Sequence, residues 1–121
     1  MQITQKNFYK KFLGRLGENK ACEFLKNLGY KILDKNFKTH VGEIDVIAKD
    51  GEEIVFIEVK TRSQEAFGSP AEAVGELKQQ KYFKVAEQYL IKNKFTASPV
   101  RFDVVEIQNG QINHIKDAFC M

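Results

Sequence analysis

The stretch from Gly42 to Arg62 constrains the fold more than any other part of the chain. It contains two apolar-rich runs, IDVIA and IVFIEV, on either side of Asp50-Gly51. An Asp-Gly dipeptide favours the positive φ angles of a tight turn between antiparallel strands. The sequence therefore predicts a β-hairpin with these two residues as its loop.

Several acidic side chains that could form a site lie on this hairpin. Side chains alternate across a strand, so Glu58 and Lys60 point to the same face. With the loop given above, Glu43 lies opposite Glu58, and Asp45 lies opposite Phe56. Asp45 is then a diagonal neighbour of Glu58 on the same face. A shift of one residue in the strand register would turn Asp45 to the other face.

Carboxylates in an otherwise apolar sheet are costly to bury unless they are paired or bind a metal. One interpretation is an ordinary cross-strand ion pair, in which Lys60 neutralises Glu58. The other is a site for Mg²⁺ or Mn²⁺, because these ions favour carboxylate oxygens and leave positions for water and phosphate. In the second case Asp45 and Glu58 bind the metal, and Lys60 faces the same phosphate. The residues alone leave both interpretations open.

Two strings on the hairpin resemble the D…ExK core of the PD-(D/E)xK nuclease superfamily: GEID at 42–45 and FIEVKTR at 56–62. More narrowly, the chain resembles the small bacterial YraN family (UPF0102), which is predicted to be endonuclease-like and related in fold to archaeal Holliday-junction resolvases. The agreement spans nearly the whole chain. It includes GRLGE at 14–18, GYKIL at 29–33, FGSP at 67–70 and RFDVV at 101–105.

The resemblance implies an α/β fold of the restriction-endonuclease-like type, with helices flanking a central mixed β-sheet. It also implies metal-dependent hydrolysis of phosphodiester bonds in DNA, with branched or junction DNA among the substrates. The implied catalytic residues are Asp45, Glu58, Lys60 and Glu18, and the implied ligands of Mg²⁺ or Mn²⁺ are Asp45, Glu58 and the backbone carbonyl of Val59. A glutamine of the second helix, Gln79 or Gln80, is a weaker candidate by the same analogy.

A nucleic-acid-binding module without catalysis is the alternative function, because a fold does not by itself establish an activity. In either case, basic side chains near the hairpin are expected to contact the nucleic-acid backbone. The candidates are Arg62, Lys78 and Lys81. The competing interpretation of the two lysines is a solvated helix face.

Length and composition set further limits. A chain of 121 residues predicts one domain over 1–121. Nineteen basic and sixteen acidic residues give a net charge of +3, which permits nucleic-acid binding without requiring it. No apolar run approaches a membrane span and the N-terminus lacks a signal-peptide core, so we expect a cytoplasmic protein with no membrane partner. The two cysteines have no metal-ligand or disulfide spacing, and Cys22 is expected to be a buried thiol. A homodimer would suit a junction resolvase, but no segment identifies an interface.

The remaining patterns predict two helices and three further strands. Apolar residues at helical spacing predict a helix over 13–28, ended by Gly29. Residues 1–12 are expected to be either a frayed start of that helix or a mobile basic arm. A second helix is predicted over 71–93, with Ser69 as its N-cap. Strands are predicted over 30–37, 99–107 and 111–115, with an Asn109-Gly110 turn between the last two.

Overall fold

The computed structural model describes residues 5–62 and 74–120, which contain five strands and two helices. The strands form one sheet in the order β1-β2-β3-β4-β5. Neighbouring strands are antiparallel except β3 and β4, which are parallel. The elements are α1 (Gln5–Asn27), β1 (Lys31–Lys38), β2 (Glu43–Asp50), β3 (Glu53–Arg62), α2 (Glu76–Lys92), β4 (Val100–Gln108) and β5 (Gln111–Phe119). The mixed sheet expected from the sequence is confirmed.

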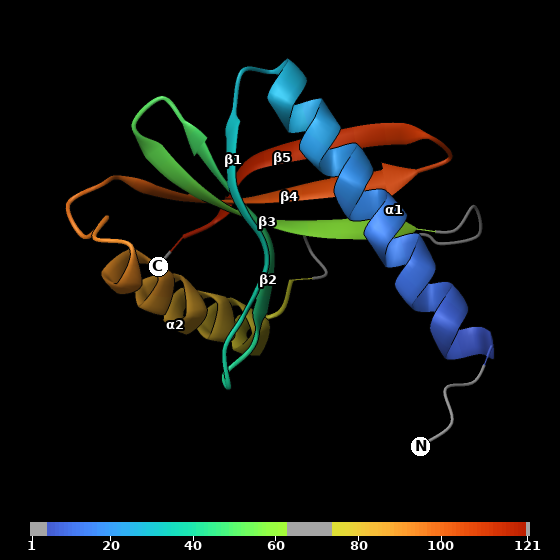
Figure 1. Ribbon diagram of the computed structural model, residues 1–121, viewed down its shortest axis with the longest axis horizontal. Coiled ribbons are helices and arrows are strands. Elements are labelled where there is room, and N and C mark those ends of the chain that lie inside the picture. The colour runs from blue at the N-terminus through green and yellow to red at the C-terminus, as the bar shows by residue number, and fades with distance from the viewer. Residues whose placement is uncertain (1–4, 63–73, 121) are drawn as a thin grey trace.

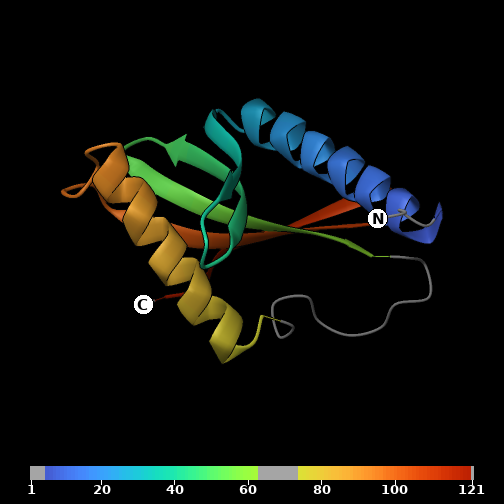
Figure 2. The ribbon, with the colours of Figure 1, turned by 60° about the horizontal axis from the view of Figure 1, so that its bottom comes forward.

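The two helices cover opposite faces of the sheet, as Figures 1 and 2 show. On one face, α2 packs over a core that includes Phe56 and Val104. On the other, α1 packs over a core that includes Ile57 and Val105. Consecutive residues of β3 and of β4 therefore alternate between the two cores, so both strands are apolar on both sides. The result is a three-layer α/β fold, consistent with a restriction-endonuclease-like arrangement.

The β2–β3 hairpin is present, but its loop differs from the prediction by one residue. Asp50 pairs with Glu53, so the loop is Gly51 and Glu52. Gly51 supplies the positive φ, at 60°. The guanidinium of Arg101 on β4 explains the difference, because Nη1 donates to both Asp50 Oδ2 (3.0 Å) and Glu53 Oε1 (3.1 Å). Every cross-strand partner is therefore two residues away from its predicted one, and a shift of two does not exchange the faces of the strands.

Helix α1 begins earlier than predicted, at Gln5. Residues 1–12 were expected to be either a frayed start of this helix or a mobile arm. From residue 5 onward they are helical. The buried stripe is also narrower than expected. Over residues 9–27 it consists of Gly17, Ala21, Cys22 and Leu25, whereas Leu16 and Leu28 are exposed. Cys22 is a buried thiol, as predicted.

The start of α2 lies later than predicted. Its first residue is Glu76 and its N-cap is Gly75, while the predicted cap Ser69 lies outside the described residues. Leu77 in the first turn of α2 is 78% exposed, and Val74 just before the helix is buried. No helix among the described residues has both the length and the hydrophobicity needed to cross a membrane.

A buried charged network joins β4 to β5 and to the start of β1. The guanidinium of Arg101 binds both carboxylate oxygens of Asp103, at 2.9 and 3.0 Å, and donates to the Tyr30 hydroxyl at 2.7 Å. His114 Nε2 and the Asp117 N–H also contact the Asp103 carboxylate, at 2.7 and 2.9 Å. Burial alone would raise the pKa of Asp103, but these hydrogen bonds, led by that of His114, hold it below its ordinary value.

We predict that Asp103→Asn destabilises the protein by about 3 kcal/mol at pH 7, because it removes the only fully buried carboxylate among the three that pair with the Arg101 guanidinium in the described residues. The lowered pKa of Asp103 means that its stabilisation is complete above the ordinary value of 3.8 and is lost as pH falls through the folded-state pKa. Urea unfolding at pH 7 and at successively lower pH should therefore show the difference between variant and wild type shrinking only in the acid range.

Glu87→Gln is the matched control, since Glu87 is an exposed carboxylate on α2. It should unfold like the wild type at every pH. An Asp103→Asn deficit that was equally large at the acid end would show that the carboxylate charge is not the stabilising feature.

Candidate active site

The candidate site lies where β2 separates from β3. The pairing of these strands ends at Val46 and Ile57, and Figure 1 shows β2 turning away from β3 beyond that point. At the split, Asp45 Oδ2 accepts a hydrogen bond from the Val59 N–H at 2.9 Å. A side chain thus takes the place of a backbone acceptor, and it holds the Asp45 carboxylate next to β3.

Asp45 carries an unfavourable charge at this position. Burial is the main cause that raises its pKa to about 7, and the hydrogen bond from Val59 opposes the rise. The neighbouring negative charges of Glu18, Glu58 and Glu43 add to it. Four carboxylates from α1, β2 and β3 therefore interact electrostatically at one point, and a cation bound there would relieve their repulsion.

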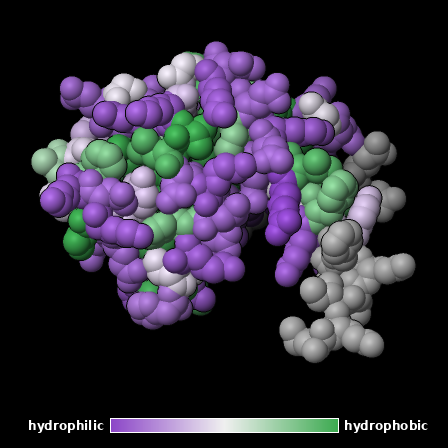
Figure 3. Space-filling view, in the orientation of Figure 1, coloured by the Kyte–Doolittle hydropathy of each residue, from purple (hydrophilic) through white to green (hydrophobic). Residues whose placement is uncertain are grey.

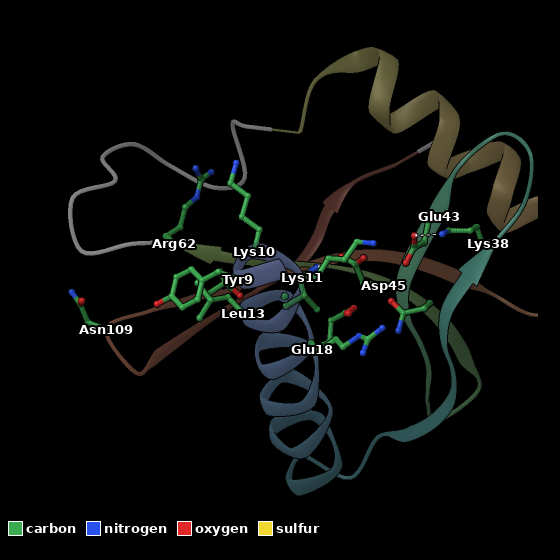
Figure 4. Close-up of a pocket in the computed structure, with 15 residues that line it drawn as sticks. Tyr9, Lys10, Lys11, Leu13, Glu18, Lys38, Glu43, Asp45, Arg62 and Asn109 are labelled. Carbon is green, nitrogen blue, oxygen red and sulfur yellow. Dashed lines mark hydrogen bonds and ion pairs between the residues drawn. The ribbon is translucent and has the colours of Figure 1, made fainter. Parts of the chain in front are cut away.

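A cavity of about 1150 Å³ opens beside Asp45 on the α1 side of the sheet. Figure 4 shows the carboxylates of Glu18, Glu43 and Asp45 with basic side chains arrayed around them. Those basic residues are Lys10, Lys11, Arg15, Lys38 and Arg62. The cavity therefore combines acidic groups with a basic surround, a distribution that suits a polyanion bound near a metal.

Asn36 connects two of the carboxylates, and the sequence analysis did not select it. With its NH₂ group turned toward them, its amide donates to Glu18 Oε2 at 2.8 Å and to Glu43 Oε1 at 2.9 Å. Its backbone has φ 54°, in the left-handed region that asparagine tolerates better than most residues. That tolerance, and the place of Asn36 just after the GYKIL string of the family resemblance, are sequence signals for a special role of Asn36. Glu43 also forms an ion pair with Lys38, at 3.8 Å.

Burial by the protein and the charge of Glu43 raise the pKa of Glu18. This finding agrees with the position of Glu18 in the cavity, where it interacts with Asp45. The single acidic residue that the sequence analysis selected on α1 is thus brought to the hairpin carboxylates.

Glu58 lies on the other side of β3, facing α2. It is 3% exposed, and Lys78 Nζ donates to its Oε1. Its Oε2 is buried and has no hydrogen-bond partner among the described residues. Lys60 is half-buried, and its pKa is lowered by burial although the charge of Glu58 acts in the opposite direction. Glu58 and Lys60 therefore point to the same side, as the alternation predicts.

The basic residues selected from the sequence lie in different places. Arg62 lines the cavity, and its Nε is 3.6 Å from Glu106 Oε2. Lys78 is bound to Glu58, and Lys81 is exposed on α2. The structure thus brings Arg62 to the cavity, and it brings Lys78 to a carboxylate instead of leaving it free for phosphate.

The weaker glutamine candidates do not point to the carboxylates. Gln79 donates its side-chain amide to the Val74 carbonyl at 2.8 Å, just before α2. Gln80 is exposed.

The carboxylates fit a metal ion that takes few ligands from the protein. Within the described ranges 5–62 and 74–120, no three His, Cys, Asp or Glu side chains are already arranged to hold an ion. Mg²⁺ commonly uses one or two carboxylates, and Asp45 and Glu58 are the two candidates from the hairpin. The unpartnered Oε2 of Glu58 is the buried polar atom that such an ion would satisfy.

Comparison with known proteins assigns the family. The sequence model described as "Uncharacterised protein family UPF0102" matches residues 17–107. The chain belongs to the UPF0102 family. This is the family that the sequence motifs resemble, and its match includes α1 from Gly17 and the whole β2–β3 hairpin.

Relatives in the UPF0102 family match over most of their length. A UPF0102 protein of Alkaliphilus oremlandii is 48% identical over 115 residues, which cover 90% of this chain and 98% of the relative. A UPF0102 protein of Thermodesulfovibrio yellowstonii is 50% identical, and the match covers 88% of this chain and 95% of the relative. A UPF0102 protein of Clostridioides difficile is 47% identical, and the match again covers 88% of this chain and 95% of the relative. The chain is therefore similar in extent to these relatives.

We predict that Asp45→Asn stabilises the protein in the absence of divalent ions. The pKa of Asp45 is raised to about 7, so its ionisation costs wild-type stability as pH rises from 3.8 to that value. Asparagine has no charge but can still accept from Val59 through its amide oxygen. The variant should be more stable by on the order of 2 kcal/mol at pH 8, with a gain that shrinks toward pH 4, measured by urea unfolding in EDTA.

Glu23→Gln, which neutralises an exposed carboxylate on α1, serves as the control and should show no such gain. If Asp45→Asn were less stable than the wild type at pH 8, the Asp45 charge would not be the destabilising element of the site.

Proposed function

We propose that this UPF0102 protein is a metal-dependent nuclease that hydrolyses phosphodiester bonds in DNA, branched or junction DNA included, in the cytoplasm. The observation that carries the proposal is the electrostatic interaction between Asp45 and Glu58 across the β2–β3 split, with the charge of Lys60 acting on Glu58. A protein that only bound polyanions would gain nothing from carboxylates beside its basic surface, because they repel phosphate. A nuclease needs them to hold a cation.

The residues that would hold Mg²⁺ or Mn²⁺ are Asp45 and Glu58, together with the carbonyl of Val59. The Val59 N–H points to Asp45. In a strand the N–H and C=O of one residue point to the same neighbour, so the Val59 carbonyl is directed to the same opening. When bound, such an ion supplies Lewis-acid chemistry, which polarises the phosphodiester and activates water at neutral pH.

The other side chains have supporting roles in this proposal. The Lys60 ammonium orients the attacking water or offsets charge that develops on the phosphate. Glu18 adds a carboxylate from α1, and its orientation is held by Asn36. Arg62, at the end of β3, contacts the DNA backbone and keeps the phosphate near the carboxylates.

The alternative function is a nucleic-acid-binding module in which the same carboxylates never organise a competent metal. The two functions differ in one measurable respect. A binding module would hold DNA equally well with and without Asp45, Glu58 and Lys60, and it would not cleave DNA with any divalent ion.

We expect cleavage with Mg²⁺ or Mn²⁺ on a panel of linear, nicked, flapped and four-way-junction DNA. Glu58→Gln and Lys60→Met should each lower the single-turnover cleavage rate by about 100-fold or more, because each removes a charge that acts at the reacting phosphate. The order of cleavage rates across the panel would identify the preferred form of DNA.

Glu87→Gln and Lys84→Met are the matched controls. They remove the same charges from exposed positions of α2, and they should cleave like the wild type. DNA binding without cleavage under either ion, unchanged in both site variants, would overturn the nuclease proposal in favour of the binding module. Cleavage that survived in both site variants would place the active site elsewhere.

Lys78 supplies a test that does not depend on cleavage. Its ammonium now neutralises Glu58, so an ion that binds Glu58 must compete with it. Lys78→Gln should therefore bind Mn²⁺ several-fold more tightly in calorimetric titration. It should also be less stable than the wild type without metal, because Glu58 is left buried and unpaired.

Added Mn²⁺ should raise the melting temperature of Lys78→Gln more than that of the wild type. Lys84→Gln, an exposed lysine of the same helix, should match the wild type in both measurements. Weaker Mn²⁺ binding by Lys78→Gln would show that Lys78 assists the metal site and does not compete for it.

A further inference from the structure

The N-terminal part of α1 extends beyond the sheet. Helix α1 has 23 residues, or a length of about 35 Å, and in Figures 1 and 2 its first turns project past the end of β3. Close packing begins at Gly17, where an added Cβ would overlap the Thr61 hydroxyl. None of residues 9–16 is buried. This part of the helix therefore lacks the packed face that normally stabilises a helix within a protein.

Basic side chains on this projecting part face the cavity of the candidate site. Lys10, Lys11 and Arg15 are exposed and line the cavity together with Glu18. Among the described residues, no carboxylate lies within ion-pair distance of any of the three. Arg15 interacts electrostatically with Glu18 on the same helix, so the charges of Lys10 and Lys11 are the most available to a ligand. Arg62 on the facing strand already has Glu106 nearby.

An aromatic side chain accompanies these charges. Tyr9 is 61% exposed and lines the same cavity. Figure 3 shows hydrophobic and hydrophilic side chains side by side on the projecting part of α1, with a hollow between them and the body of the protein. An exposed aromatic ring among lysines is the combination that stacks on bases and contacts phosphates in proteins that bind single strands.

The form of nucleic acid follows from this combination. In a duplex, both faces of each base are covered by neighbouring bases, so a tyrosine ring has no base face to stack on. An unpaired strand exposes its bases and can pass along a helix with phosphates on one side. Such a strand, lying along Lys10 and Lys11, would carry its next phosphates toward Asp45, which lines the same cavity.

We infer that residues 9–15 of α1, here called the α1 wall, bind single-stranded DNA, with Tyr9 stacking on an unpaired base and Lys10, Lys11 and Arg15 contacting phosphates. The choice of DNA as the ligand rests on the proposed function. Within that function, the α1 wall selects substrates that present an unpaired strand, such as flaps and open junctions, over continuous duplex.

The test is fluorescence anisotropy in EDTA, where cleavage cannot occur. The probes are a labelled 20-nucleotide single strand, the same strand annealed to its complement, and the corresponding RNA. Wild-type protein should bind the single-stranded DNA several-fold more tightly than the duplex and than the RNA. Tyr9→Ala should weaken single-strand binding by about 10-fold, and Tyr9→Phe should retain it.

The charge contribution is read from the salt dependence. Exchanging Lys10 and Lys11 for glutamine should reduce the slope of log K against log salt by about 1.4 for the single strand, since each phosphate contact contributes about 0.7. Exchange of two other exposed lysines, Lys84 and Lys116, is the matched control and should leave the slope nearly unchanged. Leu77→Ala, at an exposed apolar position of α2, is the control for Tyr9→Ala.

Three outcomes would overturn the inference: equal or tighter binding of duplex or RNA, no effect of Tyr9→Ala, or an equal loss in the Lys84 and Lys116 control. The result is separable from the proposed function. Single-strand binding through the α1 wall with no cleavage under any ion would keep this inference and remove the nuclease. Metal-dependent cleavage without a preference for single-stranded DNA would keep the nuclease proposal and overturn this inference.

Discussion

The hydrogen bond from the Val59 N–H to the Asp45 carboxylate is the interaction on which the candidate site depends. It forms where β2 leaves β3, and it satisfies a backbone donor that the strand pairing no longer reaches. The cavity opens beside this split, and the bond holds the Asp45 carboxylate at its lining, within electrostatic reach of Glu58. The arrangement has an energetic cost, because the ionised form of Asp45 is disfavoured by burial and by its acidic neighbours. Such a cost at one position is typical of functional sites.

Two buried acidic clusters of the sheet differ in how well their charges are satisfied. Asp103 is fully buried, and its carboxylate contacts Arg101, His114 and the Asp117 N–H. The buried Glu58, by contrast, has one oxygen without a hydrogen-bond partner among the described residues, and the pKa of Asp45 is raised by burial and by the charges of Glu18, Glu58 and Glu43. The satisfied cluster stabilises the sheet and lowers the pKa of its acid. In the unsatisfied cluster the pKa of Asp45 is raised, and a cation bound there would offset the repulsion between the carboxylates. The sheet holds these carboxylates on a rigid scaffold.

Local sequence patterns predicted the parts of the fold that depend on near neighbours. The Asn109-Gly110 turn has positive φ at both residues, as expected for a two-residue hairpin loop. Strand alternation placed Glu58 and Lys60 on one side, and helical spacing predicted α1, in which Ala21 and Leu25 are buried. The error in the hairpin came where a tertiary contact overrides local preference. Arg101 draws Asp50 and Glu53 into a pair that moves the hairpin loop.

The sequence by itself determined the strands, the acidic hairpin and the family to which the chain belongs, because alternation, turn residues and motif spacing act over a few neighbouring residues. The mixed sheet followed from the family resemblance, since the parallel pairing of β3 with β4 joins residues far apart in the chain. Only the tertiary structure decided which charges meet. Lys78 is twenty residues from Glu58 in the chain, and Asn36 is on a different element from Glu18. Whether such side chains touch depends on the angle and depth at which α1 and α2 pack on the sheet, which is a property of the whole core. For the same reason, the cavity between the projecting part of α1 and the β2–β3 split has no counterpart in any local pattern.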